Sequence, residues 1–380
     1  MKSPHRLHLF FPENDIALVA NKAHFTPPAA ARDIHAAGEA LPLWYGDDGD
    51  EVLTGGVNAQ WYDHITRLFD IRPTLHDCRY NRALRPAPWG WSAASRTAFV
   101  DVGYPPEALP CDKELCRWRE LSHRRTSAAL ARALRQSLPD IFAEPAVEAQ
   151  TVDEALSHLH DMPHAVVKTP YSSSGRGLLF TDAHAADYIR QRIAATIRRQ
   201  SSVMIEPVIS RAADFALLYD SCGDGRVEYM GLSLFESDAT GHYRGNILTD
   251  DATIAGLLGI DRLDQIIATV TAALTSLCAT RYEGPLGVDM MKSHNGTIAV
   301  AEINFRMTMG RVAHTLAQRY LRADSIGSFV VTADSGVDSG DVGAVVSEGT
   351  LISGGINLVP DGNKFRFMMY ADNRLNASFD

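Results

Sequence analysis

Residues 284–306 read GPLGVDMMKSHNGTIAVAEINFR, and this stretch decides the fold more than any other part of the chain. Two mainly apolar runs, residues 287–292 and 297–305, flank the pair Asn295-Gly296. Asn-Gly between two such runs is typical of a two-residue turn that joins antiparallel strands. We therefore predict a β-hairpin over this stretch.

The predicted turn fixes which residues of the hairpin face each other. Asp289 lies opposite Glu302, with Cβ atoms about 5 Å apart, and Asn304 projects from the same face two residues further on. Two facing carboxylates destabilise a hairpin unless a cation lies between them. Two carboxylates and an amide oxygen suit Mg²⁺ or Mn²⁺, with water and phosphate as the remaining ligands. Arg306 continues this face, within reach of a phosphate oxygen.

The alternative is a solvated hairpin face whose charges meet no metal. A lone Asp-Glu pair favours that alternative, and a one-residue change of register would remove the facing pair. The small and apolar neighbours of Asp289 and Glu302 instead indicate a protein interior, where a carboxylate needs a partner.

A lysine followed by a Ser/Gly turn is the second informative segment. Ala165-Val-Val-Lys168 reads as a buried strand whose last residue carries a charge into a cleft. The turn has little side-chain bulk, so its backbone N–H groups can approach phosphate oxygens closely. It is not a Walker loop, because the lysine precedes the glycines, and an ordinary hairpin turn is the alternative. The turn consists of Ser172, Ser173, Ser174, Gly175, Arg176 and Gly177.

The third segment is a predicted strand over residues 203–209, which carries Glu206 and is followed by Asp214. Taken alone, it is equally typical of a core strand with acidic residues at the surface.

The remaining elements alternate in a way that predicts a small α/β domain with a parallel sheet at the N-terminus. There we expect strands at 7–11 and 41–45 and a helix at 29–37, followed by an irregular, proline-rich stretch at 83–110. Further along we expect a helical region at 112–138, a capping box at Thr151 to Glu154, and helices at 182–199 and 261–280. The other predicted strands cover 215–219, 227–235 and 243–248, with two or three more in 342–370.

Composition limits the class of protein. The 380 residues are 46% hydrophobic and 22% charged, which is typical of a soluble enzyme of two or three domains. The net charge of −10 argues against binding nucleic acid through overall charge. The five scattered cysteines are typical of reduced thiols. No run approaches the roughly 20 apolar residues of a membrane span, and the N-terminal apolar run is too short for a signal peptide. We therefore expect a cytoplasmic protein with no membrane or nucleic-acid partner.

Taken in order, the three segments resemble the ATP-grasp superfamily over roughly residues 120–325. The counterparts of its motifs are Lys168-Thr-Pro170, the Ser/Gly turn, Glu206 to Ile209, Gly287-Val-Asp289 and Glu302-Ile-Asn304-Phe-Arg306. The resemblance implies an α/β and α+β chain. Residues 1–115 would form a pre-ATP-grasp-like α/β domain, followed by a two-lobed ATP-grasp fold at 116–325 with lobes at about 150–210 and 211–325. Residues 326–380 would add strands packed on the ATP-grasp domain.

The resemblance also implies roles for individual residues. Lys168 and the Ser/Gly turn contact the phosphates of ATP, Glu206 and the backbone near Val208 hold the adenine, and Asp214 is a candidate for the ribose. Asp289, Glu302 and Asn304 bind one or two Mg²⁺ ions, and Arg306 binds the transferred phosphoryl group, so that Lys168 and Arg306 are the expected catalytic residues. Where the family often has an earlier lysine, this chain has His123-Arg124-Arg125, and we assign that role to Arg125.

The implied reaction is phosphorylation of a carboxylate by ATP, followed by attack of an amine or another nucleophile on the acyl phosphate. A kinase on the same fold and a nucleotide-binding regulatory protein without catalysis remain alternatives, since a fold does not determine a function. We expect small-molecule substrates to contact residues 12–21 and 308–311, and a homodimer is possible.

Overall fold

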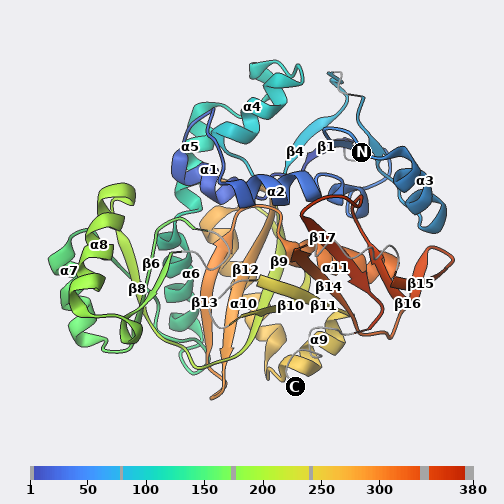
Figure 1. The fold of residues 1–380 in the computed structure, drawn as a ribbon. Coiled ribbons are helices and arrows are strands. Elements are labelled where there is room, and N and C mark those ends of the chain that lie inside the picture. The colour runs from blue at the N-terminus through green and yellow to red at the C-terminus, as the bar shows by residue number, and fades with distance from the viewer. Residues whose placement is uncertain (1–3, 78–79, 173–176, 239–242, 334–341, 373–380) are drawn as a thin grey trace.

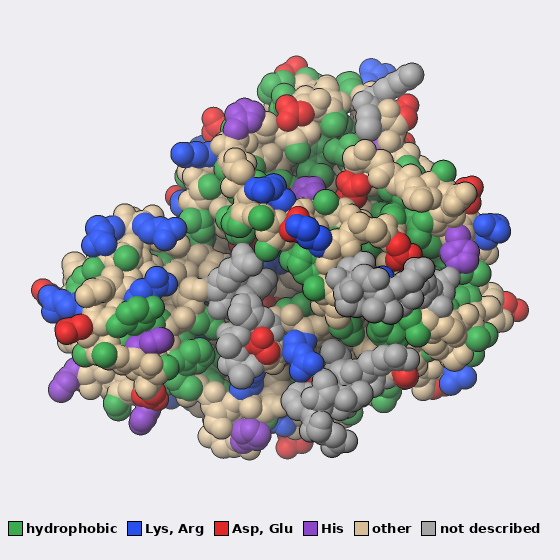
Figure 2. Space-filling view, viewed as in Figure 1, with side chains coloured by type: hydrophobic (Ala, Val, Ile, Leu, Met, Phe, Trp, Pro, Cys, Tyr) green, Lys and Arg blue, Asp and Glu red, His purple; other side chains and the backbone are tan. Residues whose placement is uncertain are grey.

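The computed structural model describes residues 4–77, 80–172, 177–238, 243–333 and 342–372. In Figure 1 the N-terminal elements lie at the top, a small lobe lies at the left, and a long central sheet continues into the C-terminal strands at the right. The small lobe protrudes from the rest of the molecule in the space-filling view of the same face (Figure 2). No helix in the described ranges combines the length and the apolar character needed to cross a membrane.

The N-terminal part is a parallel sheet with helices around it, as predicted. The strand order is β3-β2-β1-β4, and each neighbouring pair is parallel. The elements are β1 (Arg6–Leu9), α1 (Asn14–Ala20), α2 (Ala29–Gly38), β2 (Glu51–Leu53), α3 (Ala59–Leu68), β3 (Thr74–Leu75), β4 (Arg85–Pro88) and α4 (Ala93–Asp101).

Two predictions for this part were wrong. Residues 41–45 are not a strand, because Leu41–Trp44 form the 3-10 helix η1 with Pro42 in its first turn and all four side chains buried. Residues 83–110 are more regular than predicted, since they contain β4, α4 and a second 3-10 helix, η2 (Pro106–Ala108). A capping box of Ser92 and Ser95 begins α4. The usual sequence pattern is Ser/Thr-x-x-Glu/Gln, and here Ser95 stands in the place of the Glu or Gln.

The small lobe is a four-stranded antiparallel sheet in the order β5-β8-β6-β7, with α7 and α8 packed on it around their own apolar core. The predicted helix start at Thr151 is confirmed, since its hydroxyl accepts the N–H of Glu154. The predicted capping box is only half formed, because the Glu154 carboxylate accepts the N–H of Gln150 instead of that of Thr151. The predicted helix at 182–199 begins later, at Ala186, after the 3-10 helix η3 (Thr181–Ala183). The lobe comprises β5 (Val147–Ala149), α7 (Val152–Asp161), β6 (Ala165–Lys168), β7 (Leu178–Phe180), α8 (Ala186–Gln200) and β8 (Val203–Pro207).

The central sheet has nine strands in the order β13-β12-β9-β10-β11-β14-β17-β16-β15, and every neighbouring pair is antiparallel. Three strands between residues 342 and 370 agree with the prediction for the tail. The strands are β9 (Arg211–Cys222), β10 (Val227–Ser237), β11 (Tyr243–Leu248), β12 (Glu283–Ser293), β13 (Ile298–Asn304), β14 (Gly327–Ala333), β15 (Val342–Ser347), β16 (Thr350–Asn357) and β17 (Phe365–Tyr370).

Helices cover both faces of this sheet. One face packs with α6 and α10 around a core that includes Phe215 and Val288, and α9 contacts β10. On the other face α11 packs on β10 and β11, and its apolar side joins the core shared by the N-terminal sheet and the C-terminal strands. The helices are α5 (Asp112–Leu121), α6 (Arg124–Ser137), α9 (Asp251–Leu258), α10 (Leu263–Cys278) and α11 (Met309–Tyr320). In Figure 1 the end of the sheet formed by β12 and β13 lies nearest the small lobe, with the N-terminal helices above it.

The β12–β13 hairpin has the predicted facing pair but a different turn. Ser293 pairs with Thr297 through its N–H, so three residues and not two connect the strands. Met290 therefore pairs with Val300, and a bulge then shifts the register so that Asp289 pairs with Glu302 and Gly287 with Asn304. The extra turn residue and the bulge cancel each other, which is why the predicted pairing of Asp289 with Glu302 is correct.

Candidate active site

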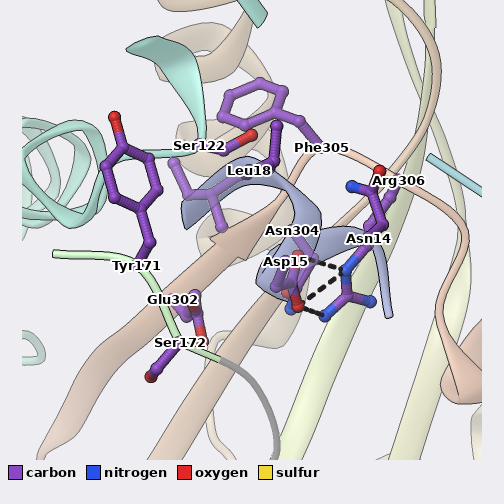
Figure 3. Close-up of a pocket in the computed structure, with 11 residues that line it drawn as sticks. Asn14, Asp15, Leu18, Ser122, Tyr171, Ser172, Glu302, Asn304, Phe305 and Arg306 are labelled. Carbon is purple, nitrogen blue, oxygen red and sulfur yellow. Dashed lines mark hydrogen bonds and ion pairs between the residues drawn. The ribbon is translucent and has the colours of Figure 1, made fainter. Parts of the chain in front are cut away.

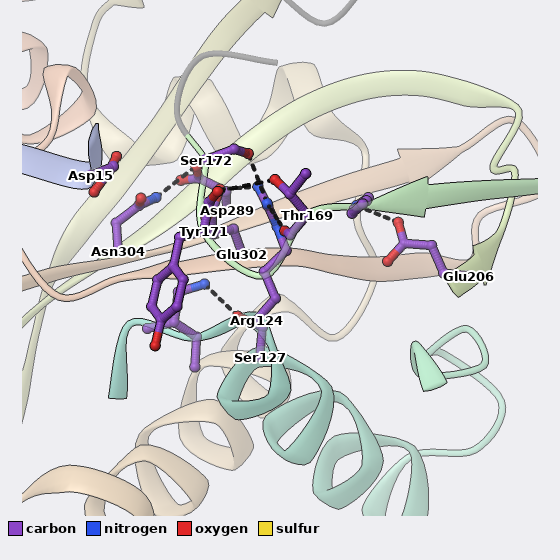
Figure 4. A network of polar contacts seen from close by, with 12 residues as sticks. Asp15, Arg124, Ser127, Thr169, Tyr171, Ser172, Glu206, Asp289, Glu302 and Asn304 are labelled. Atoms are coloured by element: carbon purple, nitrogen blue, oxygen red, sulfur yellow. Dashed lines mark hydrogen bonds and ion pairs between the residues drawn. The ribbon is translucent and has the colours of Figure 1, made fainter. Parts of the chain in front are cut away.

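Asp289, Glu302 and Asn304 lie together on one face of the hairpin. The side-chain amide of Asn304 donates to Asp289 Oδ2 at 2.8 Å, which leaves the Asn304 carbonyl oxygen available (Figure 4). Burial, together with the nearby charge of Glu302, raises the pKa of Asp289 to about 7. Burial also raises the pKa of Glu302. Both shifts have the sign expected of buried carboxyl groups, because burial penalises the charged form.

This donor set fits Mg²⁺. Within the described part of the chain no group of three or more His, Cys, Asp and Glu side chains could hold a metal ion by itself. Mg²⁺ does not need such a group, since it usually binds one or two carboxylates and takes its other ligands from water and substrate phosphates. Two carboxylates and one amide oxygen, opening toward a cleft, provide that kind of incomplete site.

Arg124 is the central cation of the site, and the sequence analysis missed it. Its guanidinium donates from Nη2 to Glu302 Oε2 at 2.9 Å and from Nη1 to Thr169 O at 2.7 Å and Ser172 Oγ at 2.8 Å. Its side chain is 9% exposed. Arg124 thus connects the Ser/Gly turn of the small lobe to the hairpin carboxylates (Figure 4).

Arg125, which we assigned from the sequence, points elsewhere. Its guanidinium lies 2.8 Å from Glu148 on β5, and its side chain is 54% exposed. Helical periodicity could have separated the two arginines. Arg124 shares a face of α6 with Ser127 and Ala128, which are buried, and the Ser127 hydroxyl accepts the N–H of Ile303 on β13 at 2.9 Å.

Lys168 ends the buried strand β6, as predicted. Its ammonium forms an ion pair with the Glu206 carboxylate, and the two side chains are only 8% and 12% exposed. The turn that follows returns at Gly177, whose φ of +79° and close approach to Thr169 both require glycine. Ser173, Ser174, Gly175 and Arg176 lie outside the described residues.

The residues expected to hold the base and the ribose lie on the two neighbouring sheets. The Val208 N–H donates to His164 O at 3.0 Å, so this N–H already has a partner. Asp214 is buried and accepts from Arg211 Nη1 at 2.9 Å. Because Asp214 pairs with Met291 across β9 and β12, its side chain shares the sheet face of Asp289.

Arg306 leaves the hairpin at the end of β13 and turns toward the N-terminal part. Its Nε and Nη2 donate to the two carboxylate oxygens of Asp15, at 3.0 and 2.7 Å, and its Nη1 donates to Met307 O at 3.1 Å (Figure 3). A guanidinium has five N–H bonds, so these contacts leave one on each Nη for a ligand.

A small pocket opens between these groups (Figure 3). The expected substrate segment 12–21 contributes part of its wall, whereas no residue of segment 308–311 lines it. Arg311 instead donates from Nη2 to Asp220 Oδ2 at 2.9 Å. The pocket is lined by Asn14, Asp15, Leu18, Ser122, Tyr171, Ser172, Glu302, Ile303, Asn304, Phe305 and Arg306.

The fold of the chain is similar to that of several solved enzyme structures along nearly its whole length. Biotin carboxylase from Campylobacter jejuni is 12% identical with a TM-score of 0.53, over 98% of this chain and 89% of that one. The biotin carboxylase domain of the Hydrogenobacter thermophilus 2-oxoglutarate carboxylase, solved with MgADP, ADP and bicarbonate, is 12% identical with a TM-score of 0.51, over 97% and 86%. N5-carboxyaminoimidazole synthetase from Staphylococcus aureus is 11% identical with a TM-score of 0.50, over 99% and 96%.

No protein-family model and no curated protein sequence matches the chain. At 11–12% identity the likeness to the solved structures concerns the fold. Biotin carboxylase and the synthetase are both ATP-grasp enzymes. The chain therefore has the ATP-grasp fold.

Proposed function

We propose that this protein is an ATP- and Mg²⁺-dependent ligase that activates a carboxylate as an acyl phosphate for attack by an amine or another nucleophile. One observation carries the proposal. Asp289 and Glu302 face each other beside Asn304, Arg124 forms an ion pair with Glu302, and the charges of Arg306 and Lys168 also act on Glu302.

The charge arrangement supports phosphoryl transfer more than a structural role. The charges of Arg124, Arg306 and Lys168 all oppose the burial that raises the pKa of Glu302. Phosphoryl transfer needs few covalent steps from the protein and depends on positioning and on cations around the transferred group. A buried carboxylate on which the charges of three cationic side chains act is suited to that task.

In this proposal each side chain has one role. Lys168, Arg124 and the Ser172–Gly177 turn hold the phosphates, and Glu206, Asp214 and the backbone near Val208 hold the nucleoside. Asp289, Glu302 and Asn304 hold Mg²⁺, which when bound neutralises phosphate charge. Arg306 offers its two remaining N–H bonds to the transferred phosphoryl group or to the carboxylate that receives it, and the pocket beside it holds the acceptor.

The similar solved structures support the ligase reading over other chemistry on the same fold. The Campylobacter jejuni enzyme was solved as a βγ-ATP complex, and the Hydrogenobacter thermophilus domain was solved with MgADP and the bicarbonate anion, which carries a carboxylate group.

The test is turnover with a panel of small carboxylic acids, each with and without amines, followed by ADP release and phosphorus NMR. The proposal predicts ADP and free phosphate in equal amounts, dependent on acid, nucleophile and Mg²⁺, and lost in Glu302→Gln. A stable phosphate ester as the only phosphorylated product, or ADP release that survives Glu302→Gln unchanged, would overturn it.

A further inference from the structure

Asp15 and Arg306 form an ion pair that joins the N-terminal part to the end of the β12–β13 hairpin. Both oxygens of the Asp15 carboxylate accept from the guanidinium, across 291 positions of sequence. The two side chains are 14% and 16% exposed. A bidentate pair that is largely withdrawn from water is held far more strongly than an ordinary surface salt bridge.

The surrounding structure is built for this contact. Asp15 lies in the first turn of α1, where the partial positive charge of a helix N-terminus favours a carboxylate. Gly90 allows α1 to approach the hairpin, since a Cβ at this position would lie 2.5 Å from Asn14 Nδ2 and 2.9 Å from Arg306 Cβ. A Cβ at position 90 would therefore require the side chain of Asn14 or of Arg306 to shift.

The guanidinium held by Asp15 lies close to the proposed metal ligands. Its charge acts on both Asp289 and Glu302, opposing the burial that raises the pKa of each carboxyl. Asp15, Glu302, Asn304 and Arg306 also line one pocket (Figure 3). If Arg306 were not neutralised, its charge would compete with a divalent cation for these carboxylates.

We propose that Asp15 is a positioning residue that holds and neutralises Arg306, so that the Asp289–Glu302 pair stays available to the metal ion and two guanidinium N–H bonds stay directed at the acceptor pocket. This inference rests on the proposed function, because it requires Asp289 and Glu302 to be metal ligands. It assigns a role in the nucleotide site to a residue of the N-terminal part.

The experiment measures Mn²⁺ binding by electron paramagnetic resonance, with the metal ion alone as the probe. Asp15→Asn keeps the shape of the side chain and removes its charge, and it should raise the Kd for Mn²⁺ on the order of tenfold, because one unbalanced positive charge then lies beside the site. The double variant Asp15→Asn/Arg306→Met removes both charges and should return the Kd to within about twofold of the parent. A residue that served only to hold the fold together would not show this recovery.

Glu13→Gln is the matched control. Glu13 directly precedes α1, is more buried than Asp15, and has a different partner, since both its oxygens accept from His35 Nδ1. This variant should leave the Kd within about twofold of the parent.

Each outcome has a distinct meaning. An unchanged Kd in Asp15→Asn, or a double variant as weak as the single one, would overturn the role of Asp15 and leave the metal site standing. If the parent protein does not bind Mn²⁺, or if Glu302→Gln leaves its Mn²⁺ binding unchanged, the metal assignment is overturned, and the role of Asp15 with it.

Discussion

Replacing Arg124 by Met tests the part of the site that the sequence did not predict. The variant removes three hydrogen bonds, to Glu302, Ser172 and the carbonyl of Thr169. A hydrogen bond to a charged group contributes about 1.5–3 kcal/mol, and breaking a fully buried ion pair costs about 3–5 kcal/mol. Glu302 is 22% exposed and keeps the charges of Lys168 and Arg306 nearby, so we expect a loss of about 2–3 kcal/mol.

That loss converts into a measurable shift of thermal unfolding. At about 2.1 cal/mol/K per residue, a chain of 380 residues has an unfolding entropy of roughly 0.8 kcal/mol/K if it unfolds as one unit. Arg124→Met should therefore lower the thermal midpoint by about 3 °C. The assay is circular dichroism or calorimetry at pH 7.5 without nucleotide.

Arg125→Met is the matched control, because it removes the same residue type one position further along the same helix. Its ion pair with Glu148 is half exposed, and such pairs contribute about 0–1 kcal/mol, so the midpoint should fall by about 1 °C or less. Equal shifts for the two variants, or a larger shift for Arg125→Met, would refute our account of which arginine belongs to the site.

Three further predictions concern Lys168, Gly177 and Asp50. Lys168→Ala should weaken ATP binding by at least about tenfold while the protein stays folded. Lys168→Arg should recover only part of the affinity, because a planar guanidinium replaces a compact ammonium group. If calorimetry shows the same ATP affinity for Lys168→Ala as for the parent, Lys168 has no role in the phosphate site. Gly177→Ala should lower the thermal midpoint or the ATP affinity, since a φ of +79° strains any residue with a Cβ, and a variant that matches the parent in both would show that the turn tolerates a side chain. Burial alone would raise the pKa of Asp50, but the hydrogen bond from His8 and the N–H groups of Asp47 and Arg6 lower it. A carboxyl group with a lowered pKa stabilises the fold above its unfolded pKa of about 3.9, and this effect is lost as the pH falls through the folded pKa. Asp50→Asn should therefore be less stable than the parent at pH 7, and the difference in unfolding free energy between the two proteins should become smaller below about pH 4.

The sequence was most informative where its signals were local. The hairpin, the buried strand before Lys168 and the cap at Thr151 each depend on a few adjacent residues, and all three are present. The facing pair Asp289 and Glu302 was predicted correctly, although the bulge that makes it possible leaves no mark in the sequence. Residues 41–44 show the limit of local signals, because a short apolar run fits a strand and a buried 3-10 helix equally well.

The parts of the site that escaped prediction depend on contacts between distant segments. Asp15 meets Arg306 because α1 packs against the end of β13, and no spacing in the sequence connects positions so far apart. Arg124 and Arg125 differ only in which side of α6 they occupy, which becomes clear once Ser127 is seen to contact β13.

The measurement that tests the central claim most directly is calorimetric titration of ATP with excess Mg²⁺ and again with EDTA, for the parent and for Glu302→Gln. Our account predicts that the parent binds ATP much more tightly with Mg²⁺, because the cation relieves the repulsion between Asp289 and Glu302, and that Glu302→Gln loses most of this difference. Equal affinity of the parent in the two buffers would contradict the assignment of Asp289, Glu302 and Asn304 as the metal site.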